Sequence, residues 1–250
     1  MIPNVVVFDI DGTLAESKQA IGAPMAQLLS ELLERTNVAV ISGGAFLQFK
    51  TQVVDQLPPS TKLASLYILP TSGGALFTNE HSSWVAQYEE NLTPEEAAAI
   101  RAVLEAAIQE SGVIEHTAVT YGERIELRGP QVSLSALGQK APPEEKRVWD
   151  PTHEKREALR DFAAARLPEF DVKIGGLTTI DITKKGVNKA YGLRKLSEAL
   201  SIPIADMLYI GDELQKDGND EVVKETGIKT RSVANPGETM QVIEELLGSA

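Results

Sequence analysis

The feature that most constrains the fold is an uninterrupted apolar run that ends in two acids, residues 5–14 (VVVFDIDGTL). A run that is apolar at every position is typical of a strand in a parallel sheet that is covered on both faces. Similar runs recur along the chain and alternate with segments of helical periodicity, as in residues 37–44 and 22–36. This alternation predicts an α/β fold with a doubly wound, Rossmann-like parallel sheet, in which ligands bind at the carboxyl ends of the strands.

The middle of the chain has a different pattern. Residues 93–112 predict a long amphipathic helix with a capping box at its start. Strand-like alternation at 118–137 and 171–183 surrounds a second helix at 151–167, which is typical of an α+β module with a partly exposed antiparallel sheet. We therefore predict a discontinuous catalytic core and an inserted α/β cap domain that sets substrate specificity, with the core at residues 1–83 and 187–250 and the cap at 84–186.

The composition limits the partners. The chain has 250 residues, a net charge of -12 and no cysteine. Such an acidic chain argues against nucleic acid or an anionic membrane as the main partner, although cations inside a pocket can still bind a small anion. Disulfides and thiolate zinc sites are excluded, and neither a signal peptide nor a membrane helix is evident. We expect a cytoplasmic protein.

Three acids stand at the ends of predicted strands. Asp9 and Asp11 follow the first strand, and Asp212 follows the apolar run at 207–211. Ordinary turn residues are the alternative, since Asp-Gly is a frequent turn signal. However, ionised carboxylates beside buried strands need a cation or strong donors, and Mg²⁺ prefers oxygen ligands of this kind. Because parallel strands end at one edge of the sheet, we predict that the three acids converge on an ion there.

Two further elements would complete a site for phosphoryl transfer. Ser42, Gly43 and Gly44 offer a hydroxyl and open backbone N–H groups at a predicted helix start, which suits a phosphate, although a plain helix cap would give the same pattern. Lys189 opens a later helix and would face the same edge of the sheet, with a solvent-exposed surface lysine as the alternative. Together these residues supply a nucleophile, metal ligands, an anion cradle and a positive charge.

The sequence FDIDGT resembles the first motif of the haloacid dehalogenase superfamily, and Ser42, Lys189 and GDELQKDGND match its second, third and fourth motifs in that order. The resemblance implies that Asp9 is a nucleophile that becomes an aspartyl-phosphate and that Asp11 is the general acid–base. It also implies that Ser42 and Lys189 bind the transferring phosphoryl group, and that Lys189 offsets the charge of the carboxylates.

The same resemblance implies a Mg²⁺ site. Its ligands would be the side chains of Asp9 and Asp212 and the backbone carbonyl of Asp11. Asn219 and Asp220 would support the metal site from the loop that follows Asp212.

The position of the insertion resembles the branch with a large mid-chain α/β cap, and stretches such as IELRG and KIGGLTTIDI resemble phosphomannomutases of the eukaryotic type. In that family, cap arginines bind the phosphate that is not transferred. Arg128 matches one such position, whereas Gln139 and Lys146 stand at two others. A solvent-exposed surface is the alternative for the basic residues near 140–147. The predicted substrate-binding residues are Gly43, Gly44, Arg128, Lys140, Lys146, Arg147, Thr179 and Asp181.

These departures bear on the reaction. A mutase must hold a bisphosphorylated intermediate, and glutamine lacks the charge and the bidentate geometry of arginine. We therefore predict a Mg²⁺-dependent phosphatase that acts on a sugar phosphate or similar small phosphate ester, with a hexose-phosphate mutase as the alternative. The resemblance suggests a homodimer. A receiver-type signalling module and a catalytically silent binding homologue are further alternatives; the insertion and Asp11 argue against the first, and the four intact motifs against the second.

Overall fold

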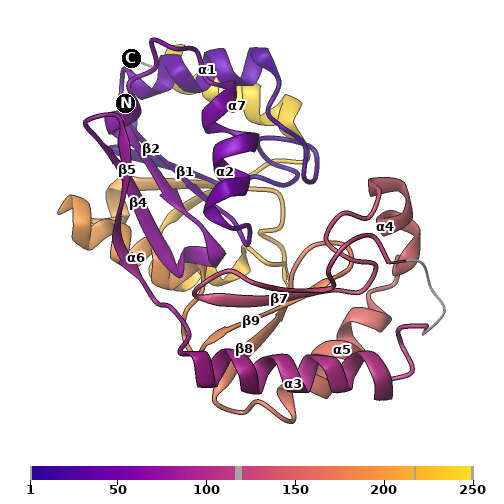
Figure 1. Ribbon diagram of the computed structural model, residues 1–250. Helices are drawn as coiled ribbons and strands as arrows, with labels where there is room; N and C mark the ends of the chain where they lie inside the picture. The colour runs from indigo at the N-terminus through magenta and orange to yellow at the C-terminus, as the bar shows by residue number, and fades with distance from the viewer. Residues whose placement is uncertain (1, 116–119, 217, 249–250) are drawn as a thin grey trace. The chain divides into compact units, whose positions relative to one another are not determined.

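The computed structural model describes residues 2–115, 120–216 and 218–248, and the chain forms two compact units (Figure 1). The core unit comprises Met1–Glu89 and Asn188–Ala250, and the cap unit comprises Glu90–Val187. The core unit continues to Glu89 because β5 (Ser83–Glu89) pairs with β4 (Ala75–Glu80) in its sheet. The sequence analysis placed the boundary after residue 83, at the start of β5, whereas the structure places it after Glu89, at the end of that strand.

Within the described residues, the core unit is built on a seven-stranded sheet in the order β11-β10-β1-β2-β3-β4-β5. Strands β11, β10, β1, β2 and β3 run parallel to one another, and β4 and β5 extend the sheet as antiparallel strands. The chain leaves β1 for β2 and β3 on one side and returns to β10 and β11 on the other, so β1 lies at the switch point where ligands bind in such sheets. The predicted doubly wound fold is confirmed. The parallel strands are β1 (Val5–Phe8), β2 (Asn37–Ile41), β3 (Leu66–Leu69), β10 (Met207–Gly211) and β11 (Lys229–Ser232).

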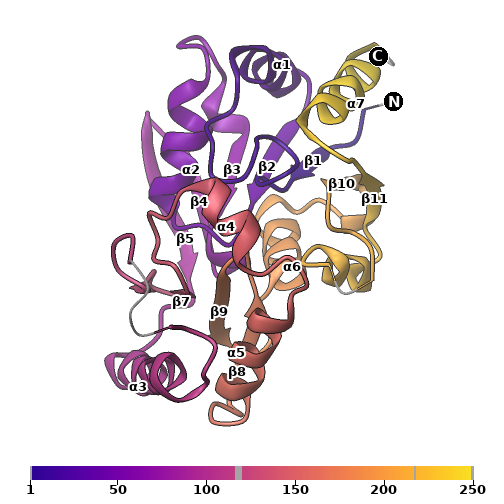
Figure 2. The same ribbon diagram turned by 90° about the vertical axis from the view of Figure 1, so that its right-hand side faces the viewer.

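Helices cover both faces of this sheet. Because side chains alternate along a strand, Val6 and Phe8 point to one face and Val5 and Val7 to the other. Val6 and Phe8 belong to the hydrophobic cluster of α1, α2 and α7, and Figure 2 shows α1 beside α7. Val5 and Val7 pack in a second cluster with residues of α6. The helices are α1 (Ala23–Leu33), α2 (Phe46–Gln52), α6 (Lys189–Leu200) and α7 (Pro236–Gly248).

The cap unit contains a four-stranded antiparallel sheet within the described residues, in the order β6-β7-β9-β8. Val132 and Ile180 on one face pack with two helices, α3 and α5, in a separate hydrophobic cluster. The alternate positions on β7 and β9, which include Ser133, Thr179 and Asp181, are polar and make up the other face. The elements are α3 (Pro94–Glu110), β6 (Ile125–Leu127), β7 (Gln131–Ser135), α4 (Pro143–Trp149), α5 (Glu154–Ala164), β8 (Phe170–Ile174) and β9 (Thr179–Lys184).

The details of some elements differ from the sequence prediction. The strand expected from residue 118 begins at Ile125, after a turn at Gly122, whose φ is +78°; residues 118 and 119 lie outside the described residues. Helix α4 was not predicted. The sequence also predicts a helix after the polar loop at 215–220, whereas the structure has a short 3-10 helix there, Glu221–Thr226, which is capped by Gly227 with a φ of +78°. In the described ranges, no helix combines the length and the apolar character needed to cross a membrane.

Helix α6 approaches the turn after β3 very closely. A Cβ atom at Gly192 would lie 2.8 Å from the Cα atom of Gly73. Gly73 has a φ of +87°, which residues with a side chain rarely adopt. The same turn is bonded to the loop after β2, because the Ser72 N–H donates to the Ser42 carbonyl at 2.8 Å. The contact thus fixes the helix that begins with Lys189 relative to the loop that contains Ser42.

We expect Gly192→Ala to lower the free energy of unfolding by about 1–3 kcal/mol, because the added methyl group must displace α6 from the backbone it touches. For a chain of this size, each kcal/mol corresponds to roughly 2–4 °C in Tm. Thermal unfolding followed by circular dichroism measures the effect. Gly248→Ala is the matched control, since a Cβ atom there meets nothing within 4 Å. Wild-type stability in Gly192→Ala would contradict the close packing.

Candidate active site

The candidate site lies at the carboxyl ends of β1, β2 and β10. Asp9 is the first residue after β1, and the parallel register places it beside the last residues of β2 and β10. Ser42 and Asp212 directly follow those two strands. The register alone therefore brings the three strand ends to one edge of the core sheet.

Three carboxylates gather at this edge. In the part of the chain that the structure describes, Asp9, Asp212 and Asp220 each offer an oxygen within 4.8 Å of the others, as a metal site requires. Asp9 is 3% exposed and Asp220 is fully buried. Asp220, which was expected only to support the metal, is thus one of the converging carboxylates. The side chain of Asp11 lies outside this group, and its Oδ1 accepts the backbone N–H of Lys18 at 2.6 Å.

Lys189 is the ammonium group that offsets part of the negative charge of this cluster. Its Nζ donates to Asp9 Oδ1 at 2.7 Å, to Asp220 Oδ1 at 2.6 Å and to Asn219 Oδ1 at 2.7 Å. An ammonium group has three N–H donors, so all three are used. The first turn of α6 holds Lys189 in place, because the Asn188 side chain caps the helix by accepting the N–H of Tyr191. The exposed-lysine alternative is excluded, since Lys189 is 5% exposed.

The cluster carries more negative than positive charge. Burial raises the pKa of Asp9 well above its ordinary value, and Asp220 adds to the rise although Lys189 opposes it. Burial also raises the pKa of Asp212 to about 6, with further contributions from Asp220 and Glu213. Burial by itself would lower the pKa of Lys189, but the Asp220 and Asp9 carboxylates outweigh it and raise that pKa. Burial is thus the main cause of the rise for both carboxyls, and the excess of carboxylates over ammonium groups adds to it.

Gly12 and Thr13 hold Asp212 in place, and the sequence analysis assigned neither a role. A Cβ atom at Gly12 would lie 2.2 Å from Asp212 Oδ2, and its φ is +82°, so only glycine fits. The Thr13 hydroxyl donates to Asp212 Oδ1 at 3.1 Å. The signal was present in DIDGT, whose glycine and threonine follow the second acid.

Strand β10 and the loop after it contribute two more residues that the sequence analysis missed, Tyr209 and Glu213. Glu213 Oε2 accepts the Asn219 side-chain amide at 2.8 Å, so that Asn219 bridges Glu213 and Lys189. The Tyr209 hydroxyl donates to Asp220 Oδ1 at 2.5 Å from within the strand. The only signal for Tyr209 was a hydroxyl in an otherwise apolar run, MLYI. Asp217, part of the predicted GDELQKDGND motif, lies outside the described residues.

The loop Ser42–Gly43–Gly44 follows β2 as predicted for a phosphate cradle. The Gly44 carbonyl accepts the N–H of Thr71 at 2.9 Å, and Ser42 is 8% exposed. The alternative interpretation of Ser42 as a helix cap is wrong, because α2 begins at Phe46 and Ala45 occupies its N-cap position.

In the cap unit, Gln139 is hydrogen-bonded to three basic residues, to two through their charged groups and to Arg124 through its backbone carbonyl. Its Oε1 accepts from Arg128 Nη2 at 3.2 Å, its Nε2 donates to the Arg124 carbonyl at 3.4 Å, and its own carbonyl accepts from Lys146 Nζ at 3.5 Å. Arg128 also pairs with Glu126 at 2.7 Å. Arg124 was missed by the sequence analysis. Its Nη2 is buried and has no hydrogen-bond partner among the described residues, which is unusual for a guanidinium nitrogen.

The other predicted cap residues fall into two groups. Thr179 and Asp181 lie together on the polar face, since a Cβ atom at Gly175 would lie 2.6 Å from Thr179 Oγ1 and 2.4 Å from Asp181 Oδ2. Lys140 and Arg147 are exposed, and in the described part of the chain neither joins the hydrogen bonds around Gln139. The structure thus brings Arg128 and Lys146 together but not Lys140 and Arg147.

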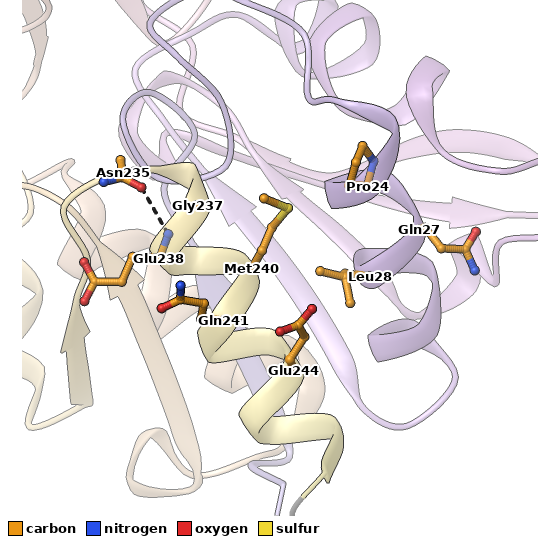
Figure 3. Close-up of a pocket in the computed structure, with 9 residues that line it drawn as sticks. All are labelled: Pro24, Gln27, Leu28, Asn235, Gly237, Glu238, Met240, Gln241 and Glu244. Atoms are coloured by element: carbon orange, nitrogen blue, oxygen red, sulfur yellow. Dashed lines mark hydrogen bonds between the residues drawn. The ribbon is translucent and has the colours of Figure 1, made fainter.

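A groove of about 840 Å³ lies elsewhere on the core unit, between α1 and α7 (Figure 3). Leu28 and Met240 line it, together with polar side chains such as Gln27, Gln241 and Glu244. None of the carboxylates around Lys189 contributes to its lining. This groove is therefore not the candidate active site.

The chain is similar to several known proteins. The sequence model of the haloacid dehalogenase-like hydrolases matches residues 6–217. A probable phosphomannomutase of Caenorhabditis elegans is 24% identical over 252 residues, which cover 98% of this chain and 95% of that protein. An IMP-bound, N-terminally truncated IMP-nucleotidase of Plasmodium falciparum has a TM-score of 0.71 at 16% identity and covers 98% of this chain and 68% of that one. A trehalose-6-phosphate phosphatase related protein has a TM-score of 0.57 at 16% identity, and the match covers 98% of this chain and 97% of that one.

The raised pKa of Asp212 predicts how Asp212→Asn changes stability in metal-free protein. Between the ordinary value of 3.8 and about 6, the native state binds more protons than the unfolded state, so this carboxyl lowers stability as the pH rises. Because Asp212 is partly exposed, solvent screening reduces the effect to about 1 kcal/mol. With EDTA present, we expect the Tm of Asp212→Asn to gain roughly 2–4 °C on the wild type between pH 4 and pH 8. If the Tm values of the two proteins changed with pH in parallel, this would contradict an excess of negative charge around Asp212.

Proposed function

The chain belongs to the haloacid dehalogenase-like hydrolase family, and on this premise we propose that it is a Mg²⁺-dependent phosphatase of small phosphate esters that works through an aspartyl-phosphate on Asp9. The observation that carries the proposal is the buried group of Asp9, Asp212 and Asp220 around Lys189. Fully ionised, these four side chains have a net charge of -2, which a divalent cation would neutralise. The residues present therefore fit the ion.

The carboxylates of Asp9, Asp212 and Asp220 would hold Mg²⁺, together with the backbone carbonyl of Asp11. When bound, the ion supplies Lewis-acid stabilisation of the charge on the phosphoryl oxygens. Lys189, whose three donors already bind Asp9, Asn219 and Asp220, offsets part of the negative charge of the cluster and fixes the nucleophile. We therefore assign it a positioning role in addition to phosphoryl binding.

In the first step, a carboxylate oxygen of Asp9 forms a bond to phosphorus while the bond from phosphorus to the ester oxygen breaks. Asp11 gives its proton to that leaving oxygen. In the second step, Asp11 takes a proton from water, whose oxygen attacks phosphorus and releases inorganic phosphate and the Asp9 carboxylate. The Ser42 hydroxyl and the backbone N–H groups of the loop to Gly44 would bind the phosphoryl oxygens.

We assign recognition of the rest of the substrate to the cap unit. The charged groups of Arg128 and Lys146 contact Gln139, and Glu126 is a neighbouring acid. Arg124, which contacts Gln139 through its backbone, adds a guanidinium with a buried nitrogen that has no partner among the described residues, in a chain whose net charge is -12. Such a cluster suits a ligand with a second anionic group, such as a sugar bisphosphate. Thr179 and Asp181 would contact hydroxyl groups of the sugar. A homodimer is proposed by analogy with the resembling family.

A hexose-phosphate mutase is the second candidate. The observation that favours it is the match over 98% of this chain to a relative described as a probable phosphomannomutase. In a mutase a sugar hydroxyl, rather than water, would take the phosphoryl group from Asp9.

Turnover with Mg²⁺ tests the proposed reaction. We expect the wild type to hydrolyse p-nitrophenyl phosphate continuously and Asp9→Asn to lose at least about a thousandfold in kcat, because an amide cannot serve as the nucleophile. Far-UV circular dichroism serves as the folding control. A single stoichiometric phosphorylation without turnover would instead indicate a signalling module.

The products separate the two reactions. With mannose 1-phosphate, Mg²⁺ and a trace of the bisphosphate, a phosphatase releases inorganic phosphate. Formation of the 6-phosphate without free phosphate would contradict the phosphatase and establish the mutase.

Arg124→Gln tests the cap assignment. We expect it to raise the KM for a hexose bisphosphate roughly tenfold, the value of one charge-assisted hydrogen bond, and to leave the KM for p-nitrophenyl phosphate unchanged. Arg147→Gln is the matched control, because the same charge is lost from an exposed position. Equal effects of the two substitutions, or equal effects on the two substrates, would contradict an anion site at Arg124.

A further inference from the structure

Tyr209 places a hydroxyl in the middle of the buried strand β10. Its ring is fully buried and packs in the hydrophobic cluster that includes Val7, Ala39 and Leu196. A phenylalanine ring would fill the same space, so packing alone does not require the hydroxyl. That hydroxyl donates to Asp220 Oδ1 at 2.5 Å.

The two oxygens of Asp220 have different surroundings. Oδ1 accepts from Tyr209 and also from Lys189 at 2.6 Å. Oδ2 accepts the backbone N–H of Glu213 at 3.3 Å, a long hydrogen bond. Oδ2 also lies over Gly211, where a Cβ atom would come within 2.4 Å of it. Two short bonds thus engage Oδ1, and Oδ2 is the oxygen that retains the most capacity to bind a cation.

The Tyr209 hydroxyl is the donor in this bond, because an ionised carboxylate can only accept and a phenol carries a proton at neutral pH.

We propose that Tyr209 is a positioning residue that sets the affinity of the Asp9–Asp212–Asp220 cluster for its divalent cation, an inference that rests on the proposed function. By anchoring Oδ1, the hydroxyl fixes the rotation of the Asp220 carboxylate and leaves Oδ2 for the ion. Without it, Lys189 is the remaining donor to Oδ1, and the carboxylate can turn about that contact. Residues that orient a metal ligand in this way typically change metal affinity by about 10–100-fold.

The test is Mg²⁺ binding by the full chain in the absence of substrate. Isothermal titration calorimetry with MgCl₂, well below the Tm of each protein, gives Kd, and the Mg²⁺-dependent rise in Tm gives it independently. We expect Tyr209→Phe to raise the Kd for Mg²⁺ about tenfold or more. At saturating Mg²⁺, we expect its KM for p-nitrophenyl phosphate to equal that of the wild type.

Tyr67→Phe is the matched control, because it removes a hydroxyl from a partly buried tyrosine of β3 in the same sheet. An unchanged Kd in Tyr209→Phe, or an equal increase in Tyr67→Phe, would overturn the inference. A lower Tm in EDTA with an unchanged Kd would assign Tyr209 a structural role only, and would overturn it as well. Absence of Mg²⁺ binding by the wild type would instead overturn the proposed metal site, so the two failures are distinguishable.

Discussion

The structure depends on an imbalance of buried charge. Asp9, Asp212 and Asp220 converge at the end of the core sheet, and Lys189 is the ammonium group that contacts two of them. Burying carboxylates without full compensation costs free energy, which is why the pKa values of Asp9 and Asp212 rise. A fold that served stability alone would replace one acid with a neutral residue. Under the proposed function, a divalent cation at the site would offset this excess charge, and the unfavourable electrostatics of the metal-free core would then be a consequence of its chemistry.

The remainder of the core unit holds this unfavourable arrangement in place. Strands β1, β2, β3 and β10 are largely apolar and are covered by helices on both faces, so their ends form a rigid edge. Two glycines then admit carboxylates where a side chain would collide: Gly12 beside Asp212, and Gly211 beside Asp220. Close packing of Gly73 on Gly192 fixes the helix that carries Lys189. Each of these contacts is steric, and together they keep like charges close.

Much of this arrangement was predictable from sequence, because parallel strands must end at one edge and DIDGT, Ser42, Lys189 and Asp212 all stand at such ends or at helix starts. The strands, the long helices and the inserted α+β unit followed from periodicity. What could not be predicted depends on contacts between distant residues. The bond from Tyr209 to Asp220 spans part of a loop whose path no local pattern specifies. The pairing of β5 with β4, which extends the core to Glu89, likewise depends on the sheet that receives it.

Gln139 shows how the structure changes the interpretation of a sequence departure. From sequence, glutamine in place of arginine meant a lost cation. In the structure, the Gln139 amide lies between Arg128 and the Arg124 backbone, and Arg124 brings a guanidinium that the family pattern did not lead us to expect. Positive charge is therefore retained in this part of the cap unit while its geometry changes, because position 139 has no guanidinium and Arg124 and Arg128 flank β6. In a mutase the sugar must bind in two orientations, so the reaction depends on the geometry of the cap cations. Hydrolysis does not depend on it in this way, because the acceptor is water. The substitution therefore favours hydrolysis over transfer back to the sugar.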